Sequence, residues 1–158
     1  MIDELRDLYQ EVILDHGRNP RNFGVPAHHT CQARGNNPMC GDRVTVYLTL
    51  DDQGVIRDAR FDGRGCAIST ASASMMTEIV KGMTLPQVEQ LFQRFHRLCT
   101  GNERAADDGD EANREALERL QVLSGVREFP VRVKCATLPW HTLKAAVAGS
   151  ADQEVTTE

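Results

Sequence analysis

The sequence predicts a single α+β domain in which a small antiparallel sheet of about three strands carries helices packed on one face. Three observations lead to this fold class. An amphipathic helical pattern comes first, a consecutive run of strand patterns follows, and the remaining chain is mostly helical in pattern. At 158 residues the chain fits one domain, which we assign to residues 1–148, with 149–158 as a flexible tail.

The first part of the chain contains one helix and the strands. Apolar residues at intervals of three and four predict a helix over 3–16 that ends near Gly17. Residues 44–50 and 55–61 are β-branched or alternating runs joined by a short polar turn, which is typical of a hairpin. A weaker strand pattern covers 28–34, so we expect three strands in all.

The second part of the chain is predicted to be helical. Glycines and a proline mark where the helices end or begin. The expected segments are a helix over 67–81, a helix from Thr84 or Leu85 to near Gly101, an acidic mobile segment over 102–113, a short helix over about 114–123, and a last helix from Cys135 or Ala136 to Ala148.

The charge pattern argues against several classes of partner. The chain has 18 basic and 23 acidic residues, a net charge of −5, and its Lys and Arg residues form no run. We therefore expect neither nucleic acid nor an anionic membrane as the partner. The N-terminus is acidic where a signal peptide is basic and then apolar, so the predicted location is the cytoplasm.

Three cysteines suggest a metal site. Cys40, Cys66 and Cys135 are far apart in sequence and lie beside glycine or other small residues, and Asp42 follows Cys40 by two positions. Thiolates are soft ligands for zinc or iron, and the carboxylate of Asp42 can complete a tetrahedral shell. Paired Cys-x-x-Cys motifs are absent, so we expect a finished fold to bring these ligands together.

Other roles for these and neighbouring residues were weighed. The three cysteines are alternatively buried core thiols, and Asp42 is alternatively a turn or cap residue. The remaining cysteines, Cys31 and Cys99, are predicted to be packing residues. Two further residues are secondary candidates for the site. His141 could be a ligand or could hydrogen-bond to one, and Arg132 could place a positive charge near the thiolates.

Several stretches of the sequence resemble the IscU/NifU-type iron–sulfur assembly family, and in particular its SufU branch, over roughly residues 3–148. The matching stretches are Asp15-His16, Asn19-Pro20-Arg21-Asn22, Asn37-Pro38-Met39-Cys40-Gly41-Asp42, Gly63-Arg64-Gly65-Cys66-Ala67-Ile68-Ser69 and Arg132-Val133-Lys134-Cys135-Ala136-Thr137-Leu138-Pro139-Trp140. Two departures from IscU favour SufU. The Leu-Pro-Pro-Val-Lys chaperone motif and the histidine before the last cysteine are missing, and the segment between Cys66 and Cys135 is long.

The resemblance implies a function. It implies that Cys40, Asp42, Cys66 and Cys135 bind zinc or a nascent iron–sulfur cluster, and that a thiol there receives sulfur from a PLP-dependent, SufS-like cysteine desulfurase and supplies the downstream Suf assembly machinery. The leading hypothesis is a zinc-dependent sulfur acceptor of sulfurtransferase type, with Cys40 as the acceptor. The alternative is a scaffold for a labile [2Fe–2S] cluster, and a third interpretation is a structural zinc domain.

Overall fold

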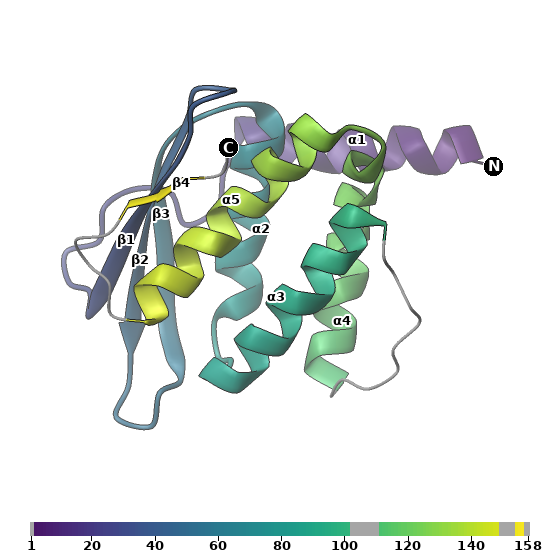
Figure 1. The fold of residues 1–158 in the computed structure, drawn as a ribbon. Helices are drawn as coiled ribbons and strands as arrows, with labels where there is room; N and C mark the ends of the chain where they lie inside the picture. The colour runs from purple at the N-terminus through teal and green to yellow at the C-terminus, as the bar shows by residue number, and fades with distance from the viewer. Residues whose placement is uncertain (1, 102–110, 149–153, 157–158) are drawn as a thin grey trace.

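The structure is a computed structural model that describes residues 2–101, 111–148 and 154–156. Its helices and strands follow the predicted order, with a short additional strand near the C-terminus (Figure 1). In chain order they are α1 (Ile2–Arg18), β1 (Cys31–Asn37), β2 (Asp42–Leu50), β3 (Ile56–Arg64), α2 (Ala67–Val80), α3 (Leu85–Thr100), α4 (Glu111–Leu120), the 3-10 helix η1 (Gln121–Glu128), α5 (Pro130–Val147) and β4 (Glu154–Thr156).

The sheet has the strand order β3-β2-β1-β4. β1, β2 and β3 pair antiparallel, as predicted, and β4 pairs in parallel with β1. Figure 1 shows the helices gathered on one side of the sheet, so the predicted α+β fold is confirmed. The expectation of a flexible tail over 149–158 differs from the structure at Glu154–Thr156, which forms β4; the remaining residues of that segment lie outside the described residues.

The alternation of side chains along β2 decides which face of the sheet is buried. Val44, Val46 and Leu48 are buried, whereas the residues between them remain partly or fully exposed. Because successive side chains on a strand point to opposite faces, the buried set faces the helices. Gly35 of β1 allows α5 to pack closely, since a Cβ there would overlap the side chain of Thr142.

The helix predicted to open at Thr84 or Leu85 agrees closely with α3. The Thr84 side chain accepts a hydrogen bond from the Gln87 amide, and Oε1 of the Gln87 side chain accepts one from the Thr84 amide. This capping box satisfies two amides at the helix start. Gly101 ends the helix with φ 80°, a left-handed conformation that favours glycine.

Two helix boundaries predicted from the sequence are wrong. The last helix, α5, begins at Pro130, so Cys135 lies inside it rather than before it. Phe129 is extended before the proline, and Pro130 has no amide to leave unpaired at the helix start, which makes this the natural starting point. The helix predicted at 114–123 is α4 followed by η1, and α4 includes residues 111–113 of the predicted mobile segment; residues 102–110 lie outside the described residues.

Candidate metal centre

The four predicted ligands come from three places in the fold that meet at one end of the sheet. Cys40 lies in the turn between β1 and β2, and Asp42 is the first residue of β2. Cys66 caps the start of α2, and Cys135 lies in the second turn of α5. The turn at Cys40 closes through Gly41, whose φ of 71° is left-handed and favours glycine.

The structure places these groups close together. One ligand atom each from Cys40, Asp42 and Cys135 lie within 4.8 Å of one another, and the sulfurs of Cys135 and Cys40 are 3.3 Å apart. Cys66 is at the side of this group, with its Sγ 3.9 Å from Oδ2 of Asp42. Its amide donates a 2.8 Å hydrogen bond to Oδ1 of the same carboxylate.

The ligand groups differ in their exposure to solvent. Asp42 and Cys135 are fully buried, whereas Cys40 and Cys66 are half-buried. Gly65 makes room for Asp42, since a Cβ on Gly65 would lie 2.5 Å from Oδ1. The centre therefore has a buried wall, formed by Asp42 and Cys135, and a side that remains accessible from solvent.

The environment favours a thiolate at Cys66. A hydrogen bond from the Cys135 thiol, followed by one from the Ser69 amide at the start of α2, lowers the pKa of Cys66 to about 6 against the opposing effect of burial. The same partnership, together with burial, raises the pKa of Cys135. The pKa of the exposed Arg132 guanidinium is raised by Cys66 first and then by Cys135, so this cation lies beside the thiols.

Asn37 is a site residue that the sequence did not single out. It is fully buried, and its Nδ2 donates toward Sγ of Cys135 at 3.7 Å. Its Oδ1 has no hydrogen-bond partner among the described residues. Asn37 and Asp42 are paired across the β1–β2 hairpin, so the strand pairing holds the asparagine next to the candidate ligands. The only signal in the sequence was its place in the motif that also contains Cys40.

The donor set fits zinc. Three sulfurs and one carboxylate oxygen are the ligand types and the number that a tetrahedral zinc site uses. Zinc–sulfur bonds of about 2.3 Å in a tetrahedron separate two sulfurs by about 3.8 Å. The 3.3 Å between the sulfurs of Cys40 and Cys135 is close to that separation. Cys66 lies outside the group whose ligand atoms are all within 4.8 Å of one another, so its side chain would have to move to complete the shell.

The other candidates lie elsewhere. His141 contacts Phe92 and His96 of α3, at ring-centroid distances of 5.0 and 6.1 Å, and neither of these rings belongs to a predicted ligand. Cys99 is a core residue, and burial raises its pKa to about 12. Cys31 packs against the core, and burial raises its pKa as well. The predictions that Cys31 and Cys99 are packing residues are confirmed.

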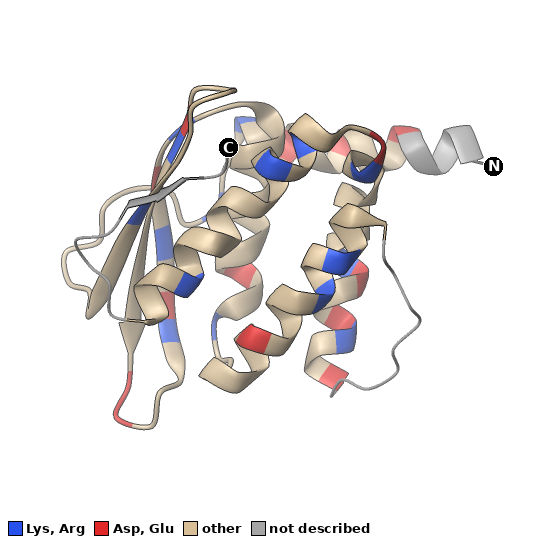
Figure 2. Ribbon diagram, in the orientation of Figure 1, with Lys and Arg blue, Asp and Glu red and all other residues tan. Residues whose placement is uncertain are grey.

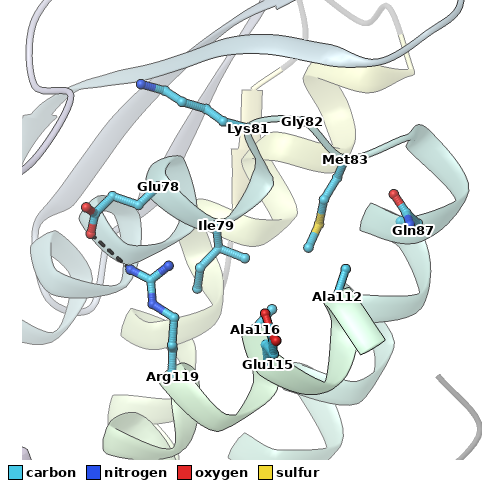
Figure 3. A pocket seen from close by; sticks show the side chains of 10 residues that line it. All are labelled: Glu78, Ile79, Lys81, Gly82, Met83, Gln87, Ala112, Glu115, Ala116 and Arg119. Atoms are coloured by element: carbon cyan, nitrogen blue, oxygen red, sulfur yellow. Dashed lines mark hydrogen bonds and ion pairs between the residues drawn. The ribbon is translucent and has the colours of Figure 1, made fainter. Parts of the chain in front are cut away.

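A pocket of about 280 Å³ lies between α2, α3 and α4 (Figure 3). Its lining is apolar at Ile79, Met83 and Ala116, and the charges of Glu78 and Arg119 pair at 3.3 Å. Glu78 and Ile79 are at the C-terminal end of α2, about 20 Å along the helix axis from Cys66 at its start. The pocket is therefore separate from the metal centre.

The fold and the donor set define a class of protein: a small α+β domain that carries thiols and a carboxylate able to hold a metal ion at one end of its sheet. Residues 8–122 match the family model for the NifU-like N-terminal domain. The chain is 42% identical to the zinc-dependent sulfurtransferase SufU of Bacillus subtilis over 91% of this chain and 92% of that protein. It is 36% identical to the iron-sulfur cluster assembly scaffold protein IscU of Streptococcus pyogenes over 99% of this chain and 93% of that one.

Solved structures agree with these relatives. The crystal structure of FiSufU from Fervidobacterium islandicum AW-1 superposes with a TM-score of 0.76 at 33% identity, covering 87% of this chain and 94% of that one. The chain belongs to the family of NifU-like N-terminal domains, which includes SufU and IscU proteins. The resemblance stated from the sequence is therefore confirmed.

Proposed function

We propose that this chain is a zinc-dependent sulfur acceptor that takes persulfide sulfur from a cysteine desulfurase for iron–sulfur cluster assembly. The single observation that carries the proposal is the position of Cys40. Its thiol is half-buried on a turn, while Asp42 and Cys135 behind it are fully buried. The Cys40 sulfur can thus be reached by a partner protein while Asp42 and Cys135 remain in place. Cys66 is also half-buried, but it caps the start of α2 and its amide is hydrogen-bonded to Asp42. The SufU relative, named a zinc-dependent sulfurtransferase, supports the same conclusion.

Zinc would be held by Cys40, Asp42, Cys66 and Cys135, and when bound it supplies a positive charge that keeps these thiols deprotonated. The acceptor is Cys40. Its Sγ attacks the terminal sulfur of the donor's cysteine persulfide, so that a new S–S bond forms on Cys40 while the donor's S–S bond breaks. The donor cysteine leaves as a thiolate, and no external oxidant is needed.

The turn that carries Cys40 suits this movement. Gly41 has a left-handed backbone, and apart from its chain neighbours no described residue has a heavy atom within 4 Å of the Cβ position there. Met39, on the other side of Cys40, is 68% exposed. Few contacts therefore oppose a displacement of the Cys40 side chain toward a docked partner, whereas Cys135 is fixed in α5.

The partners follow from this chemistry. The sulfur donor is a PLP-dependent cysteine desulfurase of the SufS type, and the sulfur passes on to the downstream Suf assembly machinery. The reaction requires free thiols, which suits the reducing cytoplasm that the sequence predicts. None of the helices that the structure describes combines the length and the apolar character needed to cross a membrane.

A second candidate is a scaffold on which a labile [2Fe–2S] cluster is assembled. The mixed set of three thiols and one carboxylate favours it, because stable clusters are ordinarily held by four cysteines. The IscU relatives are named as scaffold proteins. The missing chaperone motif weighs against an IscU-like route of cluster transfer.

One experiment separates the two candidates. Metal and acid-labile sulfide are measured in protein purified without oxygen, and desulfurase turnover is measured with wild-type, Cys40→Ala and Cys31→Ala protein. We expect about one zinc per chain, no sulfide, and stimulation that Cys40→Ala abolishes. Cys31→Ala is the matched control, because Cys31 packs against the core outside the centre. Iron with sulfide and no rate increase would support the scaffold instead.

A further inference from the structure

The face of the sheet away from the helices is only partly covered. His29, in the segment that leads into β1, packs its ring against Tyr47 at 5.1 Å, and Thr30 is hydrogen-bonded to Leu48 and Leu50. These contacts cover the half of β2 remote from the thiols. Figure 2 shows several basic positions along the strands.

The half of this outer face beside the metal centre carries three exposed arginines, which we call the arginine patch: Arg34, Arg43 and Arg64. Arg43 and Arg64 are directly opposite each other in the β2–β3 register. Both lie on the outer face, because the neighbouring Val44 faces the core. Arg34 of β1 pairs with Thr45, two residues along β2 from Arg43, and so occupies the diagonal position.

The side chains of the arginine patch are unpaired among the side chains that the structure describes. Over the described residues, no hydrogen bond or ion pair engages the side chains of these three arginines. The arginines farther along β3 do have partners, since Arg57 binds Asp51 at 2.8 Å and Arg60 binds Asp58 at 3.2 Å. Asp62 shares the outer face near the patch, and its Oδ1 accepts a hydrogen bond from the Gly63 amide. Glu154 of β4 is the register partner of Arg34, so the uncompensated pair is Arg43 and Arg64.

A pair of like charges directly opposite each other on neighbouring strands is destabilising. Arg43 and Arg64 have this arrangement, in a chain whose overall charge is −5. Neither cation adds a hydrogen bond or an ion pair to the described part of the fold, where both side chains are exposed and unpaired. An anionic group placed against the pair would remove the repulsion, which indicates a role in binding an acidic surface.

The position of the arginine patch connects it with the thiols. Arg43 directly follows the ligand Asp42, and Arg64 precedes Cys66 by two residues. Arg132, also exposed, adds a further cation on the thiol side. A protein that reaches Cys40 around this end of the sheet therefore meets positive charge on both sides of its approach.

We propose that the arginine patch docks an acidic surface of the sulfur-donating protein and so brings the donor persulfide to Cys40. This inference rests on the proposed function. It concerns the encounter of the two proteins and leaves the chemistry at the thiols unchanged. Charges at the rim of an interface act mainly on the rate of association and on its salt dependence.

The test measures desulfurase turnover against the concentration of this protein, and yields a half-saturating concentration and a maximal rate. We compare the wild type with Arg43→Gln/Arg64→Gln, leaving Arg34 unchanged because its backbone pairs with β4. The matched control is Arg97→Gln/Arg114→Gln, which removes two exposed charges from α3 and α4. Exposed ion pairs change affinity about 1.4- to 5-fold each, so we expect the half-saturating concentration to rise about fivefold.

The maximal rate should be unchanged in the Arg43/Arg64 variant, and the control should behave as wild type. The half-saturating concentration of the wild type should rise between 50 and 300 mM salt, and that of the variant should rise less. Arg43→Glu should weaken docking further, yet raise the thermal midpoint, because it places an opposite charge across from Arg64. This second variant separates docking from folding.

Three results would overturn the inference. The first is that the half-saturating concentration is the same in the Arg43/Arg64 variant as in the wild type, while the wild type still stimulates the desulfurase. This result would refute docking at the arginine patch and leave the proposed function unchanged. The second is that a labelled 20-nucleotide single-stranded DNA binds the wild type more tightly than the desulfurase does, and that this binding is lost in the Arg43/Arg64 variant. The third is a wild type that fails to stimulate the desulfurase, which refutes the proposed function and the inference together.

Discussion

Replacing Gly65 with alanine should displace the carboxylate of Asp42 and so weaken both the fold and zinc binding. The added Cβ would lie 2.5 Å from Oδ1 of Asp42, whereas ordinary contacts begin at 3.4 Å. The carboxylate or the backbone must therefore move by about 0.9 Å, the difference between these two distances. A shift of that size is enough to break the 2.8 Å hydrogen bond from the Cys66 amide to Asp42.

The magnitude follows from these two effects. Overpacking of a buried site costs about 1–3 kcal/mol. A lost hydrogen bond to a charged group costs about 1.5–3 kcal/mol. The two costs are not additive, since moving the carboxylate relieves the overlap while breaking the bond, so we expect the metal-free protein to lose about 2–4 kcal/mol of unfolding free energy. Zinc affinity should fall at least tenfold, because a ligand is misplaced.

The assays are urea unfolding of the metal-free protein and zinc competition with a chromogenic chelator. Gly125→Ala is the matched control, because nothing lies within 4 Å of its Cβ position. It should change stability by less than about 0.5 kcal/mol. If Gly65→Ala kept both its stability and its zinc affinity within the range of this control, the reasoning about the Asp42 cradle would be refuted.

Three further predictions concern pH and packing. In the metal-free protein, alkylation of Cys66 should have its midpoint near pH 6, well below an ordinary thiol. Because the pKa of Cys66 is lowered in the folded state, the free energy of unfolding should rise from about pH 6 to the ordinary pKa of a thiol. Above the ordinary thiol pKa it should fall, because the pKa of Cys135 is raised in the folded state. Urea unfolding measured as a function of pH tests both effects. Burial lowers the pKa of His16 in the folded state, so stability should also decrease as pH falls below 6.5, and His16→Gln should flatten this part of the profile. Gly35→Ala should cost about 1–3 kcal/mol, because its Cβ overlaps Thr142 of α5; an unfolding curve that matches wild type would contradict the close packing of β1 and α5.

The local elements were largely predictable from the sequence. The hairpin of β2 and β3 was found because alternating apolar residues and a polar turn are properties of neighbouring residues. The bounds of α3 followed from Thr84 and Gly101, which act within one helical turn. β1 was predicted at 28–34 but spans Cys31–Asn37, since its polar and glycine residues give a weak alternating pattern.

The structure groups Cys40, Asp42 and Cys135, with Cys66 beside Asp42, and the role of these residues in binding zinc remains a proposal. Cys40 and Cys135 are 95 positions apart and become neighbours through the packing of α5 on the sheet. The sequence could name both thiols by residue type and context. The predicted helix start at Cys135 or Ala136 is wrong, because α5 begins at Pro130, with Phe129 extended before it.

The sequence by itself determined the fold class, the family and the thiols with their companion Asp42, because these depend on residue type, local periodicity and short motifs. Only the tertiary structure decided that Asn37 lies buried beneath Cys135, that Cys40 is more accessible than Cys135, and that Arg43 faces Arg64. Those features depend on strand register and on which helix covers which face of the sheet. Such pairings join residues far apart in the chain, so no local pattern specifies them.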